Sequence, residues 1–167
     1  SLGGYYIYGE LCNRLGIEQK SMDDFSSAYV AHGFYGSLAT DFLKQYSSSD
    51  FVSLYEYNDG SVLLERRENS GSVKISESLF VYNEEVFENK TDMVFGGISS
   101  VMEITSAESL GERSSILIFG DESAKSWLPF LSSNFGRITF VELDLADEKL
   151  LSKISAADYD EILFAYG

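Results

Sequence analysis

Five uncharged residues, Ser115-Ile116-Leu117-Ile118-Phe119, run directly into the polar stretch Gly120-Asp121-Glu122-Ser123. A short apolar run without polar alternation is typical of a strand that is buried on both faces of a parallel sheet. After it, apolar residues recur at helical spacing across residues 123–134, and Pro129 should kink this helix or delay its start. The sequence thus predicts a buried strand, a sharp polar turn and a helix.

Two more strand-like runs follow at short intervals. Residues 138–143 and 162–166 predict strands, and the segment Asp147–Ser155 between them predicts a helix. An alternation of strands and helices with short loops implies parallel pairing through right-handed crossovers. The last third of the chain therefore predicts the parallel core of an α/β fold.

The first two thirds carry weaker patterns. Residues 1–15 place apolar side chains at helical spacing and predict a helix, whereas residues 16–49 predict an irregular excursion with one short helix. The apolar runs 51–57 and 61–64 are joined by Asn58-Asp59-Gly60, and an Asp-Gly turn of this kind favours a hairpin. The remaining expected elements are a strand at 73–75, a short helix at 82–87 and strands at 93–95 and 101–104.

The size and composition of the chain bound its class. With 167 residues, of which 44% are hydrophobic, residues 1–167 are expected to form a single domain around one core. The net charge of −15 repels phosphate backbones and anionic membrane surfaces, so nucleic acid is not an expected partner. The sequence has no run of about 18 apolar residues that would span a membrane and no signal-peptide pattern.

The residue types also exclude several kinds of site. One cysteine, Cys12, and one histidine, His32, exclude an internal disulfide and a zinc site of the usual Cys/His type. Acidic pairs such as Asp23-Asp24 lack the alternating ligand loop of an EF-hand and are expected to be solvated surface, so no metal is predicted. The sequence also has no glycine-rich phosphate-binding motif, and no cofactor is predicted.

The turn Gly120-Asp121-Glu122-Ser123 is the candidate site, because ligands of open parallel sheets bind beyond the carboxyl ends of the strands. A helix that begins there offers unpaired N–H groups to an anion or to a developing oxyanion. Helix capping alone also explains Asp121, Glu122 and Ser123, so both interpretations stay open. His32 is either a general base that meets Ser123 across the fold or a loop histidine without a catalytic role.

Four segments resemble the DHHW family of bacterial envelope proteins, in the same order along the chain. They are residues 1–17, Phe34-Tyr35-Gly36-Ser37-Leu38, Asp50–Tyr57 and Phe119–Leu131. This family is similar to the SGNH hydrolase-like domains of the alginate O-acetyltransferase group, which carry out acyl-ester chemistry on envelope polysaccharides. The resemblance implies a flavodoxin-like three-layer sandwich with a mainly parallel central sheet and an inserted β-hairpin region. It also implies an extracytoplasmic or cell-envelope location, with an envelope polysaccharide or an acetyl donor protein as partner.

The resemblance assigns expected roles to the residues of the turn. The family's serine nucleophile would stand in a Gly/Lys-Asp-Ser turn, served by an aspartate and a histidine from the Asp-His-His-Trp signature. That signature would lie immediately before Ser1, so the chain would be the C-terminal part of the domain. An ungapped alignment places Glu122 at the nucleophile position, keeps Asp121 and leaves Gly120 for the oxyanion turn. Ser123 becomes the nucleophile if the turn shifts by one residue.

These roles lead to three hypotheses about function. The first is an O-acetyltransferase or esterase homologue that is inactive in this chain, because Glu122 replaces the serine and the Asp/His signature is missing. The second is a non-catalytic module of the cell envelope that binds a glycan or another protein. The third is an intracellular flavodoxin-like binding domain with an anion site, which the charges of Asp121 and Glu122 disfavour.

Overall fold

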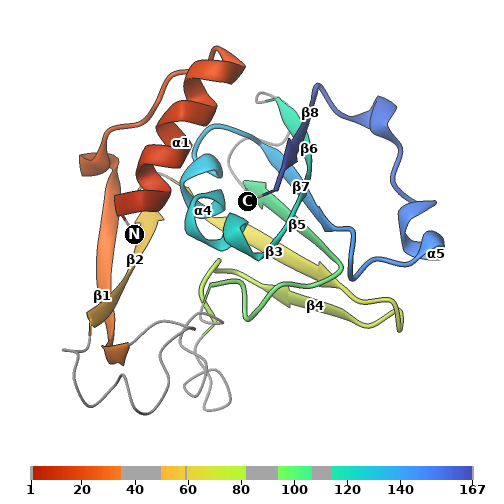
Figure 1. Ribbon diagram of the computed structural model, residues 1–167, viewed down its shortest axis with the longest axis horizontal. Coiled ribbons are helices and arrows are strands. Elements are labelled where there is room, and N and C mark those ends of the chain that lie inside the picture. The colour runs from red at the N-terminus through yellow and green to blue at the C-terminus, as the bar shows by residue number, and fades with distance from the viewer. Residues whose placement is uncertain (1, 35–49, 59, 82–93, 107–113, 167) are drawn as a thin grey trace.

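The computed structural model describes residues 2–34, 50–58, 60–81, 94–106 and 114–166. Within these ranges the largest unit is a six-stranded sheet, and a two-stranded sheet lies beside the N-terminal helix (Figure 1). In spatial order the large sheet consists of β4 (Val73–Ser76), β3 (Val62–Arg67), β5 (Val101–Ser106), β7 (Arg137–Glu142), β6 (Ser115–Gly120) and β8 (Glu161–Ala165).

The large sheet is mixed. β6 pairs in parallel with β7 on one side and with β8 on the other, as the alternation of strands and helices predicted. β5 pairs antiparallel with both β7 and β3, and β3 pairs antiparallel with β4. The prediction of a mainly parallel sheet is therefore wrong for the described strands. The turn 68–72 between β3 and β4 is too short for the crossover that a parallel pair needs.

The central strand β6 is buried on both faces. Ile116 and Ile118 are 0% exposed and belong to the larger of two hydrophobic clusters, on the face that α1 and α4 cover. Leu117 is 1% exposed and packs on the opposite face with Val141 and Leu150. The continuous apolar run thus predicted this strand and its burial correctly.

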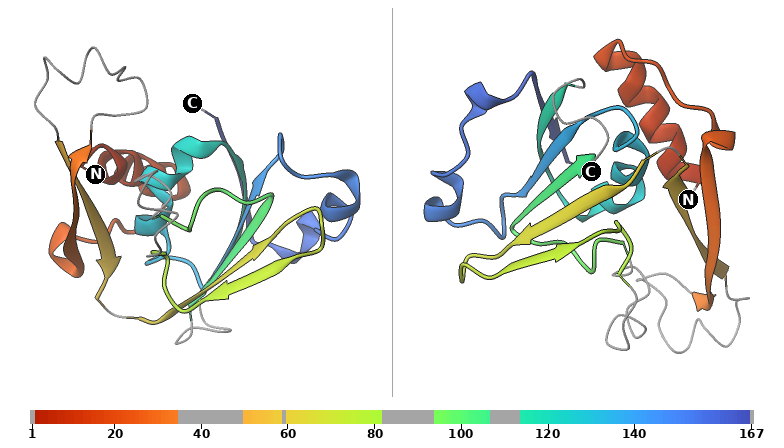
Figure 2. Two further views of the ribbon diagram at one scale, coloured as in Figure 1. Left: turned by 90° about the horizontal axis from the view of Figure 1, so that it is seen from below. Right: turned by 180° about the vertical axis from the view of Figure 1, so that it is seen from behind.

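The face with the larger cluster is covered by α1 (Leu2–Leu15) and α4 (Leu128–Leu131), as Figure 2 shows. Phe130 joins the covering elements, because its ring lies 6.0 Å from that of Tyr8 in α1 and 5.1 Å from that of Phe25 in the two-stranded sheet. Aromatic pairs at these distances add to the stabilisation that burial alone supplies. The small sheet, α1 and α4 therefore share one core with the large sheet.

The helix predicted over residues 123–134 is divided in two. A 3-10 helix, η3 (Glu122–Ser126), comes first, and the α-helix begins only at Leu128. Pro129 lies in the first turn of α4, where the missing N–H and the fixed φ of proline cost nothing. Of the two effects expected from Pro129, the delayed start is the one observed.

The opposite face carries a shorter helix than predicted. α5 (Glu148–Leu151) begins after its cap Asp147 and gives way to i→i+3 bonds, such as that from Lys153 N to Leu150 O. Bonds of this kind belong to 3-10 turns, which rarely extend far. A further 3-10 helix, η4 (Ala156–Asp158), leads into β8.

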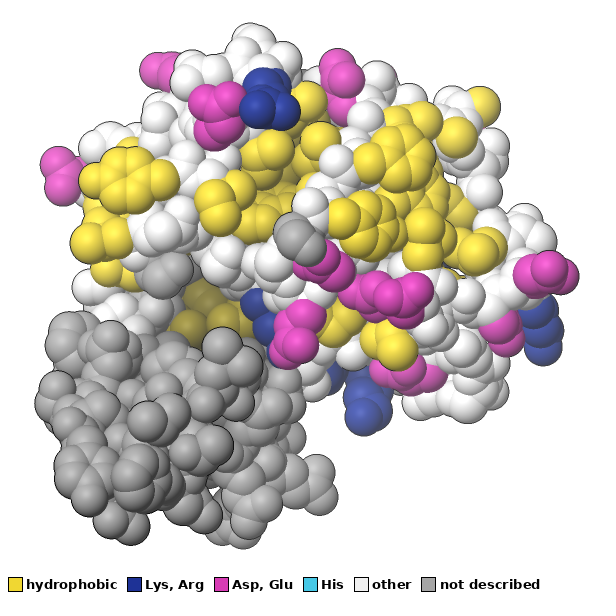
Figure 3. All heavy atoms as spheres, viewed as in Figure 1, with side chains coloured by type: hydrophobic (Ala, Val, Ile, Leu, Met, Phe, Trp, Pro, Cys, Tyr) yellow, Lys and Arg dark blue, Asp and Glu magenta, His cyan; other side chains and the backbone are white. Residues whose placement is uncertain are grey.

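Much of this second face is exposed. Strand alternation places Val73, Ile75 and Phe164 on the same side as Leu117, and they are 52%, 63% and 69% exposed. Figure 3 shows hydrophobic side chains gathered on the surface over β8, near the C-terminal end. The short helix α5 therefore covers the middle of this face and leaves its two edges open to solvent.

The small sheet corrects two predictions. β1 (Phe25–Phe34) pairs antiparallel with β2 (Asp50–Tyr57), from Phe25 opposite Tyr57 to Phe34 opposite Asp50. Part of the segment expected to be irregular is thus a ten-residue strand, preceded by the 3-10 helix η1 at residues 22–24. The hairpin predicted between β2 and β3 is wrong, because those strands belong to different sheets. An Asp-Gly pair signals a turn without specifying which strands pair.

The remaining expected elements have mixed outcomes. β4 and β5 confirm the strands expected at 73–75 and 101–104. The helix expected at 82–87 lies outside the described residues, as does Met93. Val94 forms an isolated bridge with Phe80 and Phe95 has a left-handed backbone, so the described part of the run 93–95 is not a strand. In the described ranges no helix has the length and apolar content needed to cross a bilayer.

Candidate functional site

The acidic turn lies where the sequence placed it, at the carboxyl end of β6. Gly120 closes the strand opposite Glu142 of β7 and Ala165 of β8, so the ends of all three parallel strands meet there. A Cβ atom on Gly120 would lie 2.8 Å from the Ala165 carbonyl oxygen and 2.9 Å from a ring carbon of Phe140. Only a residue without a side chain fits, and this close approach explains the glycine.

Asp121 acts as a cap in this structure. Its carboxylate accepts a hydrogen bond of 2.9 Å from the backbone N–H of Ser123, at the start of η3. The donor that an oxyanion would need at this position is therefore occupied by a carboxylate. Because η3 has only five residues, the helix dipole at the turn is also weaker than the long helix predicted from sequence would supply.

Glu122, at the expected nucleophile position, forms an ion pair. Its carboxylate lies 2.8 Å from Nζ of Lys125, and its side chain is 71% exposed whereas that of Lys125 is only 10% exposed. The backbone carbonyl of Ser123 accepts a hydrogen bond of 2.8 Å from the hydroxyl of Ser126. Both contacts hold the turn in its 3-10 conformation.

An open hollow of about 450 Å³ lies beside the turn. Its lining consists of Gly97, Ile98, Glu122, Lys125, Glu142, Asp144 and Leu145. The structure thus brings Glu122 to a concave surface, whereas Gly120, Asp121 and Ser123 do not belong to its lining.

The loop on the other side of the hollow has an unusual backbone. Phe95, Gly96 and Gly97 all have positive φ angles, of 61°, 67° and 91°. The Phe95 side chain is fully buried, and its burial offsets the cost of a left-handed conformation in a residue other than glycine. The wall of the hollow is therefore a strained loop that the core holds in place.

Glu142 is the residue of this region that sequence reasoning missed. It is only 6% exposed, and burial raises the pKa of its carboxyl group. The nearby charges of Asp144 and Asp121 raise the pKa further, while a hydrogen bond from the Asp144 backbone lowers it. The available signal was a glutamate one residue before the end of the run 138–143, on a strand expected to lie beside the turn in a parallel sheet.

The amino end of α1 lies against the same region. A Cβ atom on Gly4 would lie 1.7 Å from the carbonyl oxygen of Ser126, so the helix touches the backbone at the end of η3. The first turn of α1 and the acidic turn are therefore close in space, although more than a hundred residues separate them in sequence.

The structure does not bring His32, the one sequence candidate outside the turn, onto the same sheet as the turn. The backbone of His32 pairs with Phe51 in the two-stranded sheet, whereas the turn follows a strand of the large sheet. Among the described residues, no group of three or more His, Cys, Asp or Glu side chains is arranged to hold a metal ion. The roles expected for Gly120, Asp121, Glu122, Ser123 and His32 stay predictions.

Comparison with known proteins supports the fold. No family model matches the chain, and neither does any curated protein. A DHHW family protein from Eubacterium siraeum has a similar structure, with a TM-score of 0.76 at 19% identity over 99% of this chain and 55% of that one. Bacillus cereus PatB1 with a sulfonyl adduct has a TM-score of 0.70 at 15% identity, over 99% of this chain and 55% of PatB1. A second PatB1 structure has a TM-score of 0.68 at 17% identity, over 99% of this chain and 57% of PatB1.

These likenesses extend over the whole chain but not over the whole of the similar proteins. The chain spans a little over half the length of each solved structure that it matches. At identities below 20% they show a shared fold, that of a mixed α/β domain similar to a DHHW family protein.

Proposed function

We propose that the chain is an SGNH hydrolase-like domain of the bacterial cell envelope, related to enzymes that transfer or hydrolyse acetyl groups on polysaccharides, and that it is inactive in acyl transfer. The observation that carries this proposal is the structural match over 99% of the chain to a DHHW family protein. In this interpretation the parallel strands β7, β6 and β8 form the core of a flavodoxin-like sandwich, and the acidic turn occupies the position of the catalytic turn.

The similarity to PatB1 supports acyl chemistry as the ancestral activity. PatB1 is described with a sulfonyl adduct. Sulfonyl groups attach to activated nucleophiles, the same kind of group that attacks an ester carbonyl.

The chemistry of the turn argues against acyl transfer in this chain. A serine nucleophile needs a base beside it and N–H donors for the oxyanion. Glu122 has no hydroxyl group, and its carboxylate is paired with Lys125. The N–H of Ser123 already donates to Asp121. The negative charges around the turn would repel a developing oxyanion.

The structure also contains an observation that favours the second function, a non-catalytic binding module. The hollow beside Glu122 is lined by one lysine and three carboxylates, which suit hydrogen bonds to sugar hydroxyl groups better than contacts to an anion. A glycan segment is the ligand of that module.

The experiment that tests the proposal places serine at position 122 in a protein extended at its N-terminus by the Asp-His-His-Trp signature. Wild type, Ser123→Ala, Glu122→Ser and Glu122→Ser/Ser123→Ala are assayed with p-nitrophenyl acetate and acetylated xylan. They are also treated with phenylmethylsulfonyl fluoride, and adducts are located by mass spectrometry. We expect no turnover and no adduct in wild type, and both in the two variants that carry serine at the nucleophile position.

The outcomes separate the hypotheses. Turnover in wild type that Ser123→Ala abolishes would contradict the proposed inactivity and make Ser123 the nucleophile. A folded Glu122→Ser variant without turnover or adduct would favour the binding module. In that case, glycan-array binding that the variant Glu142→Gln alters would place the ligand in the hollow.

A further inference from the structure

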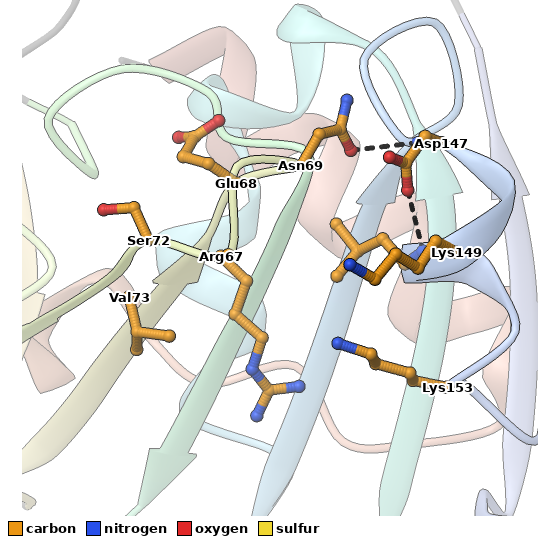
Figure 4. A pocket seen from close by; sticks show the side chains of 10 residues that line it. Arg67, Glu68, Asn69, Ser72, Val73, Asp147, Lys149 and Lys153 are labelled. Atoms are coloured by element: carbon orange, nitrogen blue, oxygen red, sulfur yellow. Dashed lines mark hydrogen bonds between the residues drawn. The ribbon is translucent and has the colours of Figure 1, made fainter.

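A second concave site lies on the opposite face of the sheet, between the β3–β4 turn and α5. It is a pocket of about 70 Å³, and Figure 4 shows the side chains that line it. The lining consists of Arg67, Glu68, Asn69, Gly71, Ser72, Val73, Asp147, Lys149, Leu150 and Lys153. Three basic residues therefore meet in a chain whose net charge is −15.

The two walls of this pocket are fixed by hydrogen bonds. Asn69 donates from Nδ2 to the carbonyl oxygen of Leu145 at 2.6 Å and accepts from the backbone N–H of Asp147 at 3.0 Å. The side chain of one residue in the β3–β4 turn thus ties that turn to the segment leading into α5. The pocket is held open between two connected elements and does not depend on a flexible loop closing over it.

The basic side chains converge, and the acidic ones are used elsewhere. In Figure 4 the amino groups of Lys149 and Lys153 point toward the strand that carries Arg67. The carboxylate of Asp147 accepts the backbone N–H of Leu150 at 2.8 Å, as the cap of α5. The Glu68 side chain points away from the basic groups.

The basic groups retain capacity for a ligand. Arg67 uses Nε for an ion pair of 2.5 Å with Glu65. Among the described residues, neither Lys149 nor Lys153 forms an ion pair. Two ammonium groups and a guanidinium group that face one space repel each other, and an anion between them removes that repulsion.

We propose that this pocket binds a phosphate group, either free inorganic phosphate or the terminal phosphate of a phosphomonoester. A water molecule takes up about 10–15 Å³ of such a cavity, so about 70 Å³ holds a group of roughly five heavy atoms, the number in phosphate. Near neutral pH a phosphate group carries close to two negative charges, and the basic groups favour it over a monovalent carboxylate.

The test is a titration of the full chain with sodium phosphate at constant ionic strength, followed by backbone amide chemical shifts. We expect saturable shifts confined to residues 67–73 and 147–153, and weaker binding of sodium acetate at the same positions. Glucose 1-phosphate distinguishes the two sources: it binds at least as tightly as inorganic phosphate if the natural ligand is a phosphomonoester, and more weakly if the ion is free phosphate.

Substitutions locate the binding energy. Lys149→Gln and Lys153→Gln should each raise the dissociation constant for phosphate by about twofold to tenfold. This is the loss expected when one exposed ion pair or one charge-assisted hydrogen bond is removed. Lys149→Arg should retain it. Lys74→Gln is the matched control, because it changes the net charge equally, but Lys74 is exposed on the other face of β4. Equal losses in Lys74→Gln and Lys149→Gln, or shifts that do not saturate, would overturn the proposal.

Discussion

One glycine sets the distance between the first helix and the acidic turn. At Gly4 a Cβ atom would lie 1.7 Å from the carbonyl oxygen and 2.5 Å from the carbonyl carbon of Ser126. Both are backbone atoms and cannot rotate away as a flexible side chain can. Any larger residue at this position therefore forces α1 away from η3.

This contact predicts that Gly4→Ala destabilises the protein. The expected loss is about 1–3 kcal/mol of unfolding free energy, the usual cost of overpacking, measured by urea denaturation. Gly3→Ala is the control, because Gly3 is exposed in the same helix. There, alanine should be neutral or stabilise by up to about 1 kcal/mol. Equal losses in the two variants would contradict the contact.

The buried carboxyl group of Glu142 predicts a pH-dependent effect. Burial raises its pKa in the folded state, so its contribution to stability is present below the unfolded pKa and is lost as the pH rises through the folded value. Glu142→Gln should therefore be more stable than wild type at pH 7, and the difference should disappear below about pH 4.3, the ordinary glutamate value.

Unfolding curves at several pH values between 4 and 8 check this expectation. Glu161→Gln is the control, since Glu161 is an exposed carboxylate in β8. A gain of stability in Glu142→Gln that is the same at every pH would show that burial of the charge is not its cause.

At the scale of elements, the hydroxyl group of Tyr8 connects three segments. It donates to Oδ1 of Asn134 at 2.6 Å, after α4, and accepts from the backbone N–H of Lys20 at 2.9 Å. Burial raises the pKa of Tyr8 to about 12, so the hydroxyl stays a donor throughout the neutral range. α1, the segment that follows it and the end of α4 are thus joined at one buried atom.

Removing this atom should loosen all three segments. Tyr8→Phe removes the acceptor of the Lys20 N–H and one of the two donors to Oδ1 of Asn134, and should cost about 1–3 kcal/mol of unfolding free energy. Tyr6→Phe, at a side chain that is 74% exposed in the same helix, should change it by less than about 0.5 kcal/mol. Thermal unfolding monitored by near-UV circular dichroism compares the two variants, and a loss at Tyr6 as large as that at Tyr8 would contradict the network.

Some elements could be predicted from the sequence and others could not. The apolar runs of β6 and β7 predicted both the strands and their burial on two faces. The similar run of β8 predicted the strand but not its exposure, because β8 lies at the edge of the described sheet and exposes Ile162 and Phe164. β1 was missed because two register shifts, between Tyr29 and Ala31 and between His32 and Phe34, break its alternation. Pairing partners are long-range properties, so the turn at residues 58–60 could not reveal that β2 joins β1.

The candidate site was predictable in part for the same reason. A turn after a buried strand is a local signal, and it placed Glu122 correctly at the carboxyl end of β6. The loop with Gly97 and the strand end with Glu142 reach the same hollow through the sheet order. No local pattern contains that order, so Gly97 could not be assigned to the site from sequence, whereas Glu142 could be reached only through the predicted parallel pairing of the strands at 115–119 and 138–143.

At the scale of the whole molecule, the net charge and the exposed apolar surface have opposite effects on self-association. The net charge of −15 keeps copies of the chain apart, while the second face of the sheet exposes Ile162, Phe164 and Tyr166 along its edge strand. Salt at about 0.1 M shortens the range of the repulsion to roughly 10 Å and leaves apolar attraction in place. Edge strands with apolar side chains are known sites of association.

We therefore expect self-association that increases with salt, measured as average mass by light scattering. Phe164→Asp should reduce it by removing the most exposed ring of this face, which stacks on Phe119 at 5.1 Å. Tyr6→Asp adds the same charge on α1, on the other side of the molecule, and should have a smaller effect. If both variants reduce the association equally, net charge and not the exposed face controls it.

The position of β6 between two parallel neighbours has a consequence for how the molecule opens. Among the described strands, β6 is enclosed by β7 and β8, whereas β8 has a partner on one side only. The amide protons of β6 that bond to β7 exchange only when the centre of the sheet opens, whereas those of β8 exchange when one edge strand peels away. Deuterium uptake should therefore begin at the C-terminal strand and reach the central strand last, so that the acidic turn sits at the boundary between the slowest and the fastest parts of the sheet.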